Sequence, residues 1–337
     1  MPKLLPHALC ITDDPSLRRT LRRSLQAAGS TVEFRSARGT EEHEAPPQIL
    51  VVDSPARQEI QAPELVLRAG DHGDVICLGG SLEDDAVVQL LRNFPFDHLI
   101  TDAGKGDGGD EDEIVVTSVK LLTGDIFGLE KYLAWGVKVH EVAVRSYEEK
   151  RVGLLTIADH AKDVGARRQV VAKIESVTDE LLMNAMYDAP AVSRGETPRV
   201  PTAADVHTGE DSEVALLRYA CDGRYFAVSV EDAYGGLEKK AILDHLIRAR
   251  VERGRPRTGS ETTGGAGLGL YFVLSSVTRF IANIDQGRRT EVICLFDLCQ
   301  SGREAEACTR SLHVFRQEHE EPATDDEPTR PGMVRTS

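Results

Sequence analysis

The 337-residue sequence predicts an α/β protein with two domains. Three observations support this prediction. In the first hundred residues, short apolar runs alternate with helical patterns, which is typical of a doubly wound parallel sheet. From about residue 137, two helical patterns are followed by β-hairpin patterns. Between these parts, residues 102–113 are rich in glycine and acidic side chains, which is typical of a flexible linker.

The N-terminal part, residues 1–101, contains the alternation of strands and helices. Four short, mostly apolar stretches are predicted as buried parallel strands: residues 8–11, 49–52, 75–78 and 98–100. Residues 15–28 are predicted as a helix because leucines recur at helical spacing and Gly29 follows. Residues 83–92 have the pattern of a second helix.

Acidic residues follow two of these strands. Asp13 and Asp14 come after the first strand, and Asp53 follows the strand at 49–52. In such a sheet, functional groups gather at the carboxyl ends of the strands. The arrangement resembles a response-regulator receiver domain. The resemblance implies that Asp13 and Asp14 hold Mg²⁺ and that Asp53 accepts a phosphoryl group.

Two departures from the receiver pattern favour a pseudo-receiver that serves for docking. The hydroxyl residue of the family falls at Gly79 here, and its lysine falls at Thr101. Without both, a phosphorylated Asp53 would be poorly stabilised. A phosphorylatable receiver is the alternative. Asp13 and Asp14 are also suited to cap the helix that follows them, and this role is compatible with either interpretation.

Residues 114–136 are strongly apolar, and Gly124 and Gly128 divide them into two predicted short helices. The segment is predicted either to pack against the second domain or to form a dimer surface. Packing is favoured because Phe127 and Trp135 are too large to leave exposed. At the other end of the chain, residues 301–337 are predicted as a mostly disordered acidic tail.

The second domain, residues 137–300, begins with a strand and two helices. The first helix starts at a Ser-x-x-Glu capping box at Ser146, and the second runs from about residue 167 to 187. Glu180 and Asn184 are four residues apart, so they point the same way from the second helix. An amide oxygen can coordinate Mg²⁺, and a carboxylate one turn earlier can act as a general base. The alternative is a solvated Glu and Asn on an exposed helix face.

Two glycine-containing stretches follow this helix. Strands at 214–219 and 225–230 are joined at Asp222-Gly223, and the second strand leads into Asp232, Gly235 and Gly236. Further on, three glycines alternate before an apolar helix: Gly265, Gly267 and Gly269. Backbone N–H groups at such a helix start can bind phosphate.

Together, these three stretches resemble the motifs of the GHKL ATP-binding superfamily, which implies an α/β sandwich of the Bergerat type that binds Mg²⁺ and ATP. The resemblance implies that Glu180 is the general base, that Asn184 holds the magnesium, and that Asp232 accepts a hydrogen bond from adenine. The remaining nucleotide-binding positions that it implies are Gly235, Gly236, Thr263, Gly265, Gly267, Leu268 and Gly269. Tyr234 departs from the family by replacing a glycine. A mobile lid is expected over the phosphates, with Arg255, Arg257, Thr262 and Thr263.

The run from Ile174 to Ala185 is similar to the anti-sigma-factor serine kinases of this superfamily. This resemblance implies phosphorylation of a serine on an antagonist protein, or sequestration of a sigma factor, under control of the receiver-like domain. The chain lacks the phosphoacceptor histidine motif of sensor kinases. The alternatives are a non-catalytic interaction switch gated by nucleotide, or a scaffold.

The bulk composition limits the cellular location and the binding partners that we expect for the protein. The formal net charge of -15 disfavours nucleic acid and anionic membranes. No signal peptide or membrane span is recognisable, and the six cysteines form no CxxC pair. The sequence therefore predicts a reduced, cytoplasmic protein with a protein partner, and a homodimer is one of the possible assemblies.

Overall fold

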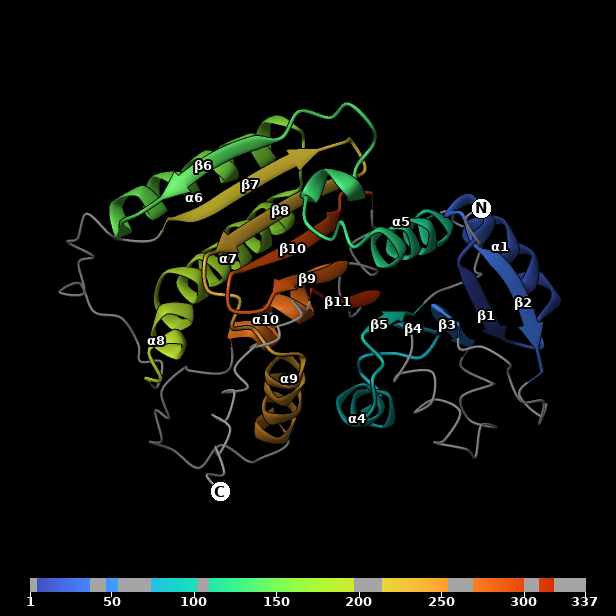
Figure 1. Ribbon diagram of the computed structural model, residues 1–337. Helices are drawn as coiled ribbons and strands as arrows, with labels where there is room; N and C mark the ends of the chain where they lie inside the picture. The colour runs from blue at the N-terminus through green and yellow to red at the C-terminus, as the bar shows by residue number, and fades with distance from the viewer. Residues whose placement is uncertain are drawn as a thin grey trace, which may run out of the picture.

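The computed structural model describes residues 5–36, 47–53, 74–101, 109–196, 214–253, 269–299 and 309–317. The strands are β1 (His7–Ile11), β2 (Thr31–Arg35), β3 (Ile49–Asp53), β4 (Asp74–Leu78), β5 (His98–Ile100), β6 (His140–Val144), β7 (Ala215–Cys221), β8 (Tyr225–Asp232), β9 (Arg279–Asp285), β10 (Arg289–Asp297) and β11 (Ser311–Gln317). They form one eleven-stranded sheet in the order β2-β1-β3-β4-β5-β11-β9-β10-β8-β7-β6 (Figure 1). The expected domain boundary therefore lies inside a continuous sheet.

The N-terminal half of the sheet is parallel throughout, in the order β2-β1-β3-β4-β5. Apolar side chains of α1 (Pro15–Ala27) and α5 (Gly109–Thr123) cover one face, and those of α4 (Asp85–Asn93) cover the other. The predicted α/β class is confirmed, with helices on both faces of these parallel strands. β2 was not predicted, because this edge strand is short and only two of its five residues have large apolar side chains.

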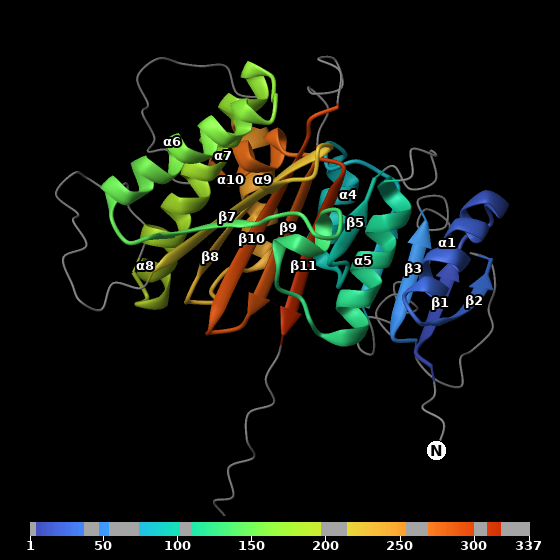
Figure 2. The same cartoon turned by 90° about the horizontal axis from the view of Figure 1, so that it is seen from above.

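The second half is mainly antiparallel, from β9 through β10, β8 and β7 to the edge strand β6. Four helices lie on the same side of the sheet as α4 (Figure 2): α6 (Tyr147–Asp163), α7 (Arg168–Met183), α9 (Lys239–Arg253) and α10 (Gly269–Ser276). The salt bridge from Arg92 of α4 to Asp244 of α9, at 2.5 Å, helps to join the helices of the two halves. This helix layer covers one hydrophobic core that is shared by both halves.

The strands alternate between two cores, as a pleated sheet requires. In β8, Phe226, Val228 and Val230 pack into the helix layer, while Ala227 faces the opposite side. That opposite side is covered by α5 and the short 3-10 helix η1 (Leu129–Tyr132). Among the described residues, no helix has the length and apolar character needed to cross a bilayer.

Strand β11 joins the two halves and corrects one expectation. Residues 311–317 belong to the predicted acidic tail, but they form a strand between β5 and β9. The strand is antiparallel to β5 over three residue pairs and parallel to β9 over seven. Most of its side chains are buried, because both neighbouring strands and both adjacent cores surround it.

A second correction concerns the predicted linker at 102–113. Residues 109–113 form the first turn and a half of α5, and Glu113 is 2% exposed. Its carboxylate contacts Arg279 Nε of β9 at 3.1 Å and His313 Nε2 of β11 at 2.9 Å. The acidic composition suggested a solvated segment, but this carboxylate is buried because Arg279 neutralises it and His313 forms a hydrogen bond with it.

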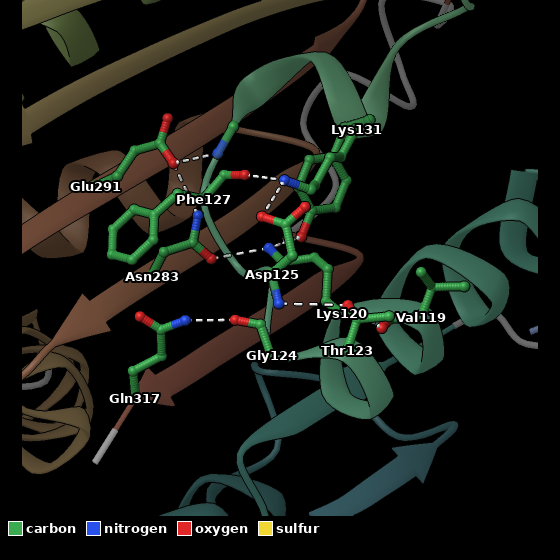
Figure 3. A network of polar contacts seen from close by, with 12 residues as sticks. Val119, Lys120, Thr123, Gly124, Asp125, Phe127, Lys131, Asn283, Glu291 and Gln317 are labelled. Carbon is green, nitrogen blue, oxygen red and sulfur yellow. Dashed lines mark hydrogen bonds and ion pairs between the residues drawn. The ribbon is translucent and has the colours of Figure 1, made fainter. Parts of the chain in front are cut away.

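Further along α5, Lys120 inserts its amine beneath η1 (Figure 3). Its Nζ donates to Asn283 Oδ1 at 2.8 Å and to Tyr132 Oη at 2.7 Å, and it lies 3.8 Å from the ring centre of Phe315. Glu291 completes this network, because it accepts hydrogen bonds from the Asn283 amide and from Gly128 N–H. Burial lowers the pKa of Lys120 to about 6.

The apolar segment 114–136 packs against the sheet in part. α5 ends at Thr123, and Gly124 after it has a φ of 69°; the 3-10 helix η1 follows Gly128, whose φ is 111°. Phe127 is half-buried beneath the guanidinium of Arg289. Trp135, however, is fully exposed on the turn before β6. Its size does not force burial, so the prediction that Trp135 packs was wrong.

The low pKa of Lys120 predicts a pH-dependent stability term. Between about pH 6 and the ordinary lysine value near 10.4, the unfolded chain binds a proton that the folded chain lacks. The free energy of unfolding should therefore rise with pH, by up to about 1.4 kcal/mol per unit. Urea denaturation from about pH 6.5 to 8.5 should show this rise in the wild type, and Lys120→Met should remove it. If the free energies of unfolding of the wild type and Lys120→Met differ by the same amount at every pH, the low pKa of Lys120 is contradicted.

The exposure of Trp135 predicts its fluorescence, because it is the one tryptophan in the sequence. Emission should resemble that of free tryptophan in water, and acrylamide should quench it readily. Trp135→Phe should change the free energy of unfolding by less than about 0.5 kcal/mol. A shielded, blue-shifted emission would instead indicate that another molecule or a second copy of the chain covers this turn.

Candidate functional site

The helix that carries Glu180 changes from α-helical to π-helical winding at Asn184. α7 is α-helical to Met183, η2 (Asn184–Asp188) is a π-helical turn, and α8 (Ala189–Ser193) completes the rod. Ala189 N–H donates to the Asn184 carbonyl five residues earlier, which is the π-type bond. The wider turn precedes Pro190, which has no N–H to donate. Such π turns are frequent at functional sites.

Glu180 lies against the first residue of α10. A methyl group at Gly269 would overlap the Glu180 carboxylate, so the two segments meet at this point. Burial raises the pKa of Glu180, and the carboxylates of Asp188 and Asp179 raise it further, while Lys150 opposes them. The structure therefore brings together two of the predicted site residues, from α7 and α10.

Two neighbours of Glu180 were missed from the sequence. Lys150 of α6 is buried, forms a 2.5 Å ion pair with Asp179, and contacts the Met183 sulfur at 3.1 Å. Asp188, one π turn after Asn184, has its pKa raised by burial. Lys150 lies three residues before Gly153 and seven before Ile157, and both of these are buried. This helical spacing is the sequence pattern from which the burial of Lys150 could have been predicted.

Asp232 ends β8 and begins a tight turn. Its Oδ1 accepts a hydrogen bond from Tyr234 N–H at 2.9 Å, and the backbone N–H groups of Gly235 and Thr290 also point toward the carboxylate. Burial nevertheless raises its pKa to about 6. The residue as a whole is half-buried.

Thr290 lies directly opposite Asp232 in the β8–β10 register. Directly opposed residues of antiparallel strands project to the same face. Thr290 is 1% exposed, and its hydroxyl has no hydrogen-bond partner among the residues that the structure describes. A single threonine in a strand pattern gave no signal from which to predict this position.

The turn after Asp232 requires a glycine at one position. Gly235 has a φ of 61°, and a methyl group there would overlap the backbone of the β9–β10 turn, including the Asp285 carbonyl. The Gly235 carbonyl also accepts a hydrogen bond from Gly287 N–H at 3.3 Å. At Gly236 there is more room, since the nearest atom to such a methyl is a Val192 methyl at 4.0 Å. Val192 of α8 is 49% exposed and was not predicted as a site residue.

These groups share one face of the sheet. Val230 and Val292, each two residues from Asp232 and Thr290, pack into the same helix layer as α7 and α10. The alternation of strands therefore directs Asp232 and Thr290 to the side where Glu180 lies. The other predicted positions fall outside the described residues: Arg255, Arg257, Thr262, Thr263, Gly265, Gly267 and Leu268.

The acidic residues of the N-terminal half have structural partners. Asp14 caps α1, with Oδ1 accepting from Ser16 N–H at 2.8 Å, as the capping interpretation predicted. Asp13 contacts Arg18 at 3.5 Å. Asp53 is 5% exposed and accepts a hydrogen bond from the Thr12 hydroxyl. Within the described ranges, no three His, Cys, Asp or Glu side chains gather as a metal site of that kind would require.

Comparison with known proteins gives no assignment. No protein-family model matches the chain, and a search of curated protein sequences finds no significantly similar protein. The site must therefore be interpreted from its own geometry.

The turn at Gly235 leads to a direct test. Gly235→Ala should lower the free energy of unfolding by about 1–3 kcal/mol, because an alanine strains at this φ and meets backbone atoms. Gly236→Ala is the matched control and should stay within about 0.5 kcal/mol of the wild type. Urea denaturation measures both. Equal effects of the two substitutions would contradict the described turn.

Proposed function

We propose that the chain binds Mg²⁺ and an adenine nucleotide between α7, the end of β8 and the start of α10. The observation that carries this proposal is the pairing of Asp232 with Thr290. Asp232, which is half-buried, offers a carboxylate, and Thr290 offers a buried hydroxyl that has no hydrogen-bond partner among the described residues. The adenine edge presents an amino donor beside a ring-nitrogen acceptor, which these two groups complement. Leaving a buried hydroxyl unsatisfied costs about 1–3 kcal/mol, so a ligand that pairs with it gains stability.

The opposite end of the proposed site would hold the phosphates. Asn184, on the π turn, offers an amide oxygen to Mg²⁺, whose bound charge would stabilise negative charge on the phosphate oxygens. The start of α10 at Gly269 offers a helix N-terminus to the phosphates. These contacts agree with the resemblance of the three sequence stretches to the GHKL superfamily.

Glu180 is the residue we assign as general base. Its raised pKa makes it a stronger base than an ordinary carboxylate, which suits deprotonation of water or of an incoming hydroxyl. The similarity of residues 174–185 to anti-sigma-factor kinases supports a serine of a partner protein as acceptor. If Glu180→Gln abolishes turnover and keeps nucleotide binding, the protein is an enzyme. If the wild type binds ATP and alters partner affinity without turnover, it is a nucleotide-gated switch.

The N-terminal half is proposed as a docking and regulatory module. Asp14 caps α1, and Asp53 accepts a hydrogen bond from Thr12. These contacts favour a pseudo-receiver over a phosphorylated receiver. Its sheet continues into the half that carries the proposed nucleotide site, so a partner bound to one half has a packed connection to the other.

Titration with a fluorescent ATP analogue tests the binding site. Asp232→Asn should weaken binding at least about tenfold, because the carboxylate acceptor is replaced by an amide. Thr290→Val should weaken binding while it leaves the apolar packing intact. Asn184→Asp should change the dependence of binding on Mg²⁺.

The same hairpin provides the control. Asp222 lies at the other end of the β7–β8 pair and also accepts backbone hydrogen bonds, from Arg224 and Tyr225 N–H. Asp222→Asn should leave the affinity for the ATP analogue unchanged. Equal affinity in the wild type, Asp232→Asn and Thr290→Val would contradict the proposed site.

A further inference from the structure

Strand β11 meets β5 through a pair of buried histidines. His98 and His313 are directly opposite in the register, and their Nδ1 atoms are 3.3 Å apart. Both side chains are at most 1% exposed, and the His98 ring also packs 4.5 Å from that of Phe315. This pairing covers three residues of each strand and is the place where the N-terminal half of the sheet meets the rest.

The contacts at this joint favour one arrangement of protons when both rings are neutral. His313 places Nε2 on the Glu113 carboxylate at 2.9 Å, so that nitrogen is the donor. A neutral His313 then has a bare Nδ1, which accepts from Nδ1–H of His98. If both rings were protonated, two N–H groups would face each other and the contact would be repulsive.

The surroundings disfavour added positive charge. Basic side chains face the histidine pair from four of the elements packed around it: Lys120 from α5, Arg279 from β9, Lys239 from α9 and Arg316 from β11. The opposing carboxylates are Glu113 and Asp97, and both already pair with cations of this set. Burial, followed by the charges of His313 and Lys120, holds the pKa of His98 well below its ordinary range.

We propose that the β5–β11 pairing is an acid-sensitive joint, which opens when His98 and His313 take up protons. Opening separates the two halves of the sheet and exposes one edge of each. The direction follows from proton linkage. An exposed histidine has a pKa near 6.5, so the open form binds protons that the closed form excludes. The equilibrium constant for opening should therefore rise by up to about 30-fold per histidine between about pH 7.5 and pH 5.

Hydrogen exchange with mass spectrometry on the full chain tests the proposal. After correction for intrinsic exchange rates, peptides from β5 and β11 should lose protection at about pH 5 relative to about pH 7.5, more than peptides from β8 and β10. Lys120 acts in the same direction down to about pH 6, so variants must isolate the histidines. In His98→Phe, the rise in the opening constant should be up to about 30-fold smaller than in the wild type. His98→Gln serves as a second neutral replacement if the first does not fold.

A second histidine pair is the matched control. The ring centres of His140 in β6 and His160 in α6 are 4.9 Å apart, at the far edge of the sheet, and both residues are partly exposed. His160→Phe should keep the wild-type pH response at β5 and β11. The proposal is overturned if β8 and β10 lose protection together with β5 and β11. It is equally overturned if both His98 variants retain the full wild-type rise.

Discussion

The charge-balanced contact among Glu113, Arg279 and His313 is the interaction on which the continuous sheet depends. It buries a carboxylate, a guanidinium and an imidazole at one point between α5, β9 and β11. Burial alone would raise the pKa of Glu113, but Arg279 and His313 bring it below its ordinary value. Removing one partner of such a buried pair typically costs about 3–5 kcal/mol, because the remaining charge is left without compensation.

This contact also explains why α5 serves both halves. Its N-terminal turns pack on α1, where Arg23 and Glu111 form a 2.5 Å ion pair at the surface. Its later turns carry Lys120 beneath η1 and against Phe315. A helix that is bound to both halves restricts rotation of one against the other. The proposed regulation therefore rests on a shared, packed sheet and not on a flexible tether.

Local patterns predicted much of the fold. The apolar runs at 49–52 and 75–78 and the leucine spacing of 15–28 became β3, β4 and α1, because burial and periodicity are recorded in a few neighbouring residues. β11 was missed because its place depends on partners 200 and 215 residues away in sequence, at Glu113 and His98. Composition likewise misled at 109–113, where acidic residues enter a helix whose buried member meets distant basic side chains.

The candidate site was likewise predicted from the sequence only in part. The resemblance of three sequence stretches to the GHKL superfamily singled out Glu180, Asn184 and Asp232, while helical spacing and a hairpin pattern predicted only the elements that carry them. Thr290 and Lys150 were not singled out, because their significance arises from tertiary neighbours. The sequence resemblance also gave no indication that Asn184 would begin a π-helical turn.

The central position of β11 has a consequence for biosynthesis. The ribosome releases β5 roughly two hundred residues before its neighbour in the sheet, so this strand waits with an unpaired edge while the intervening chain is made. Long sequence separation of this kind slows folding and leaves a nascent chain prone to association through open strands. The nascent polypeptide would accordingly benefit from chaperone protection until β11 emerges.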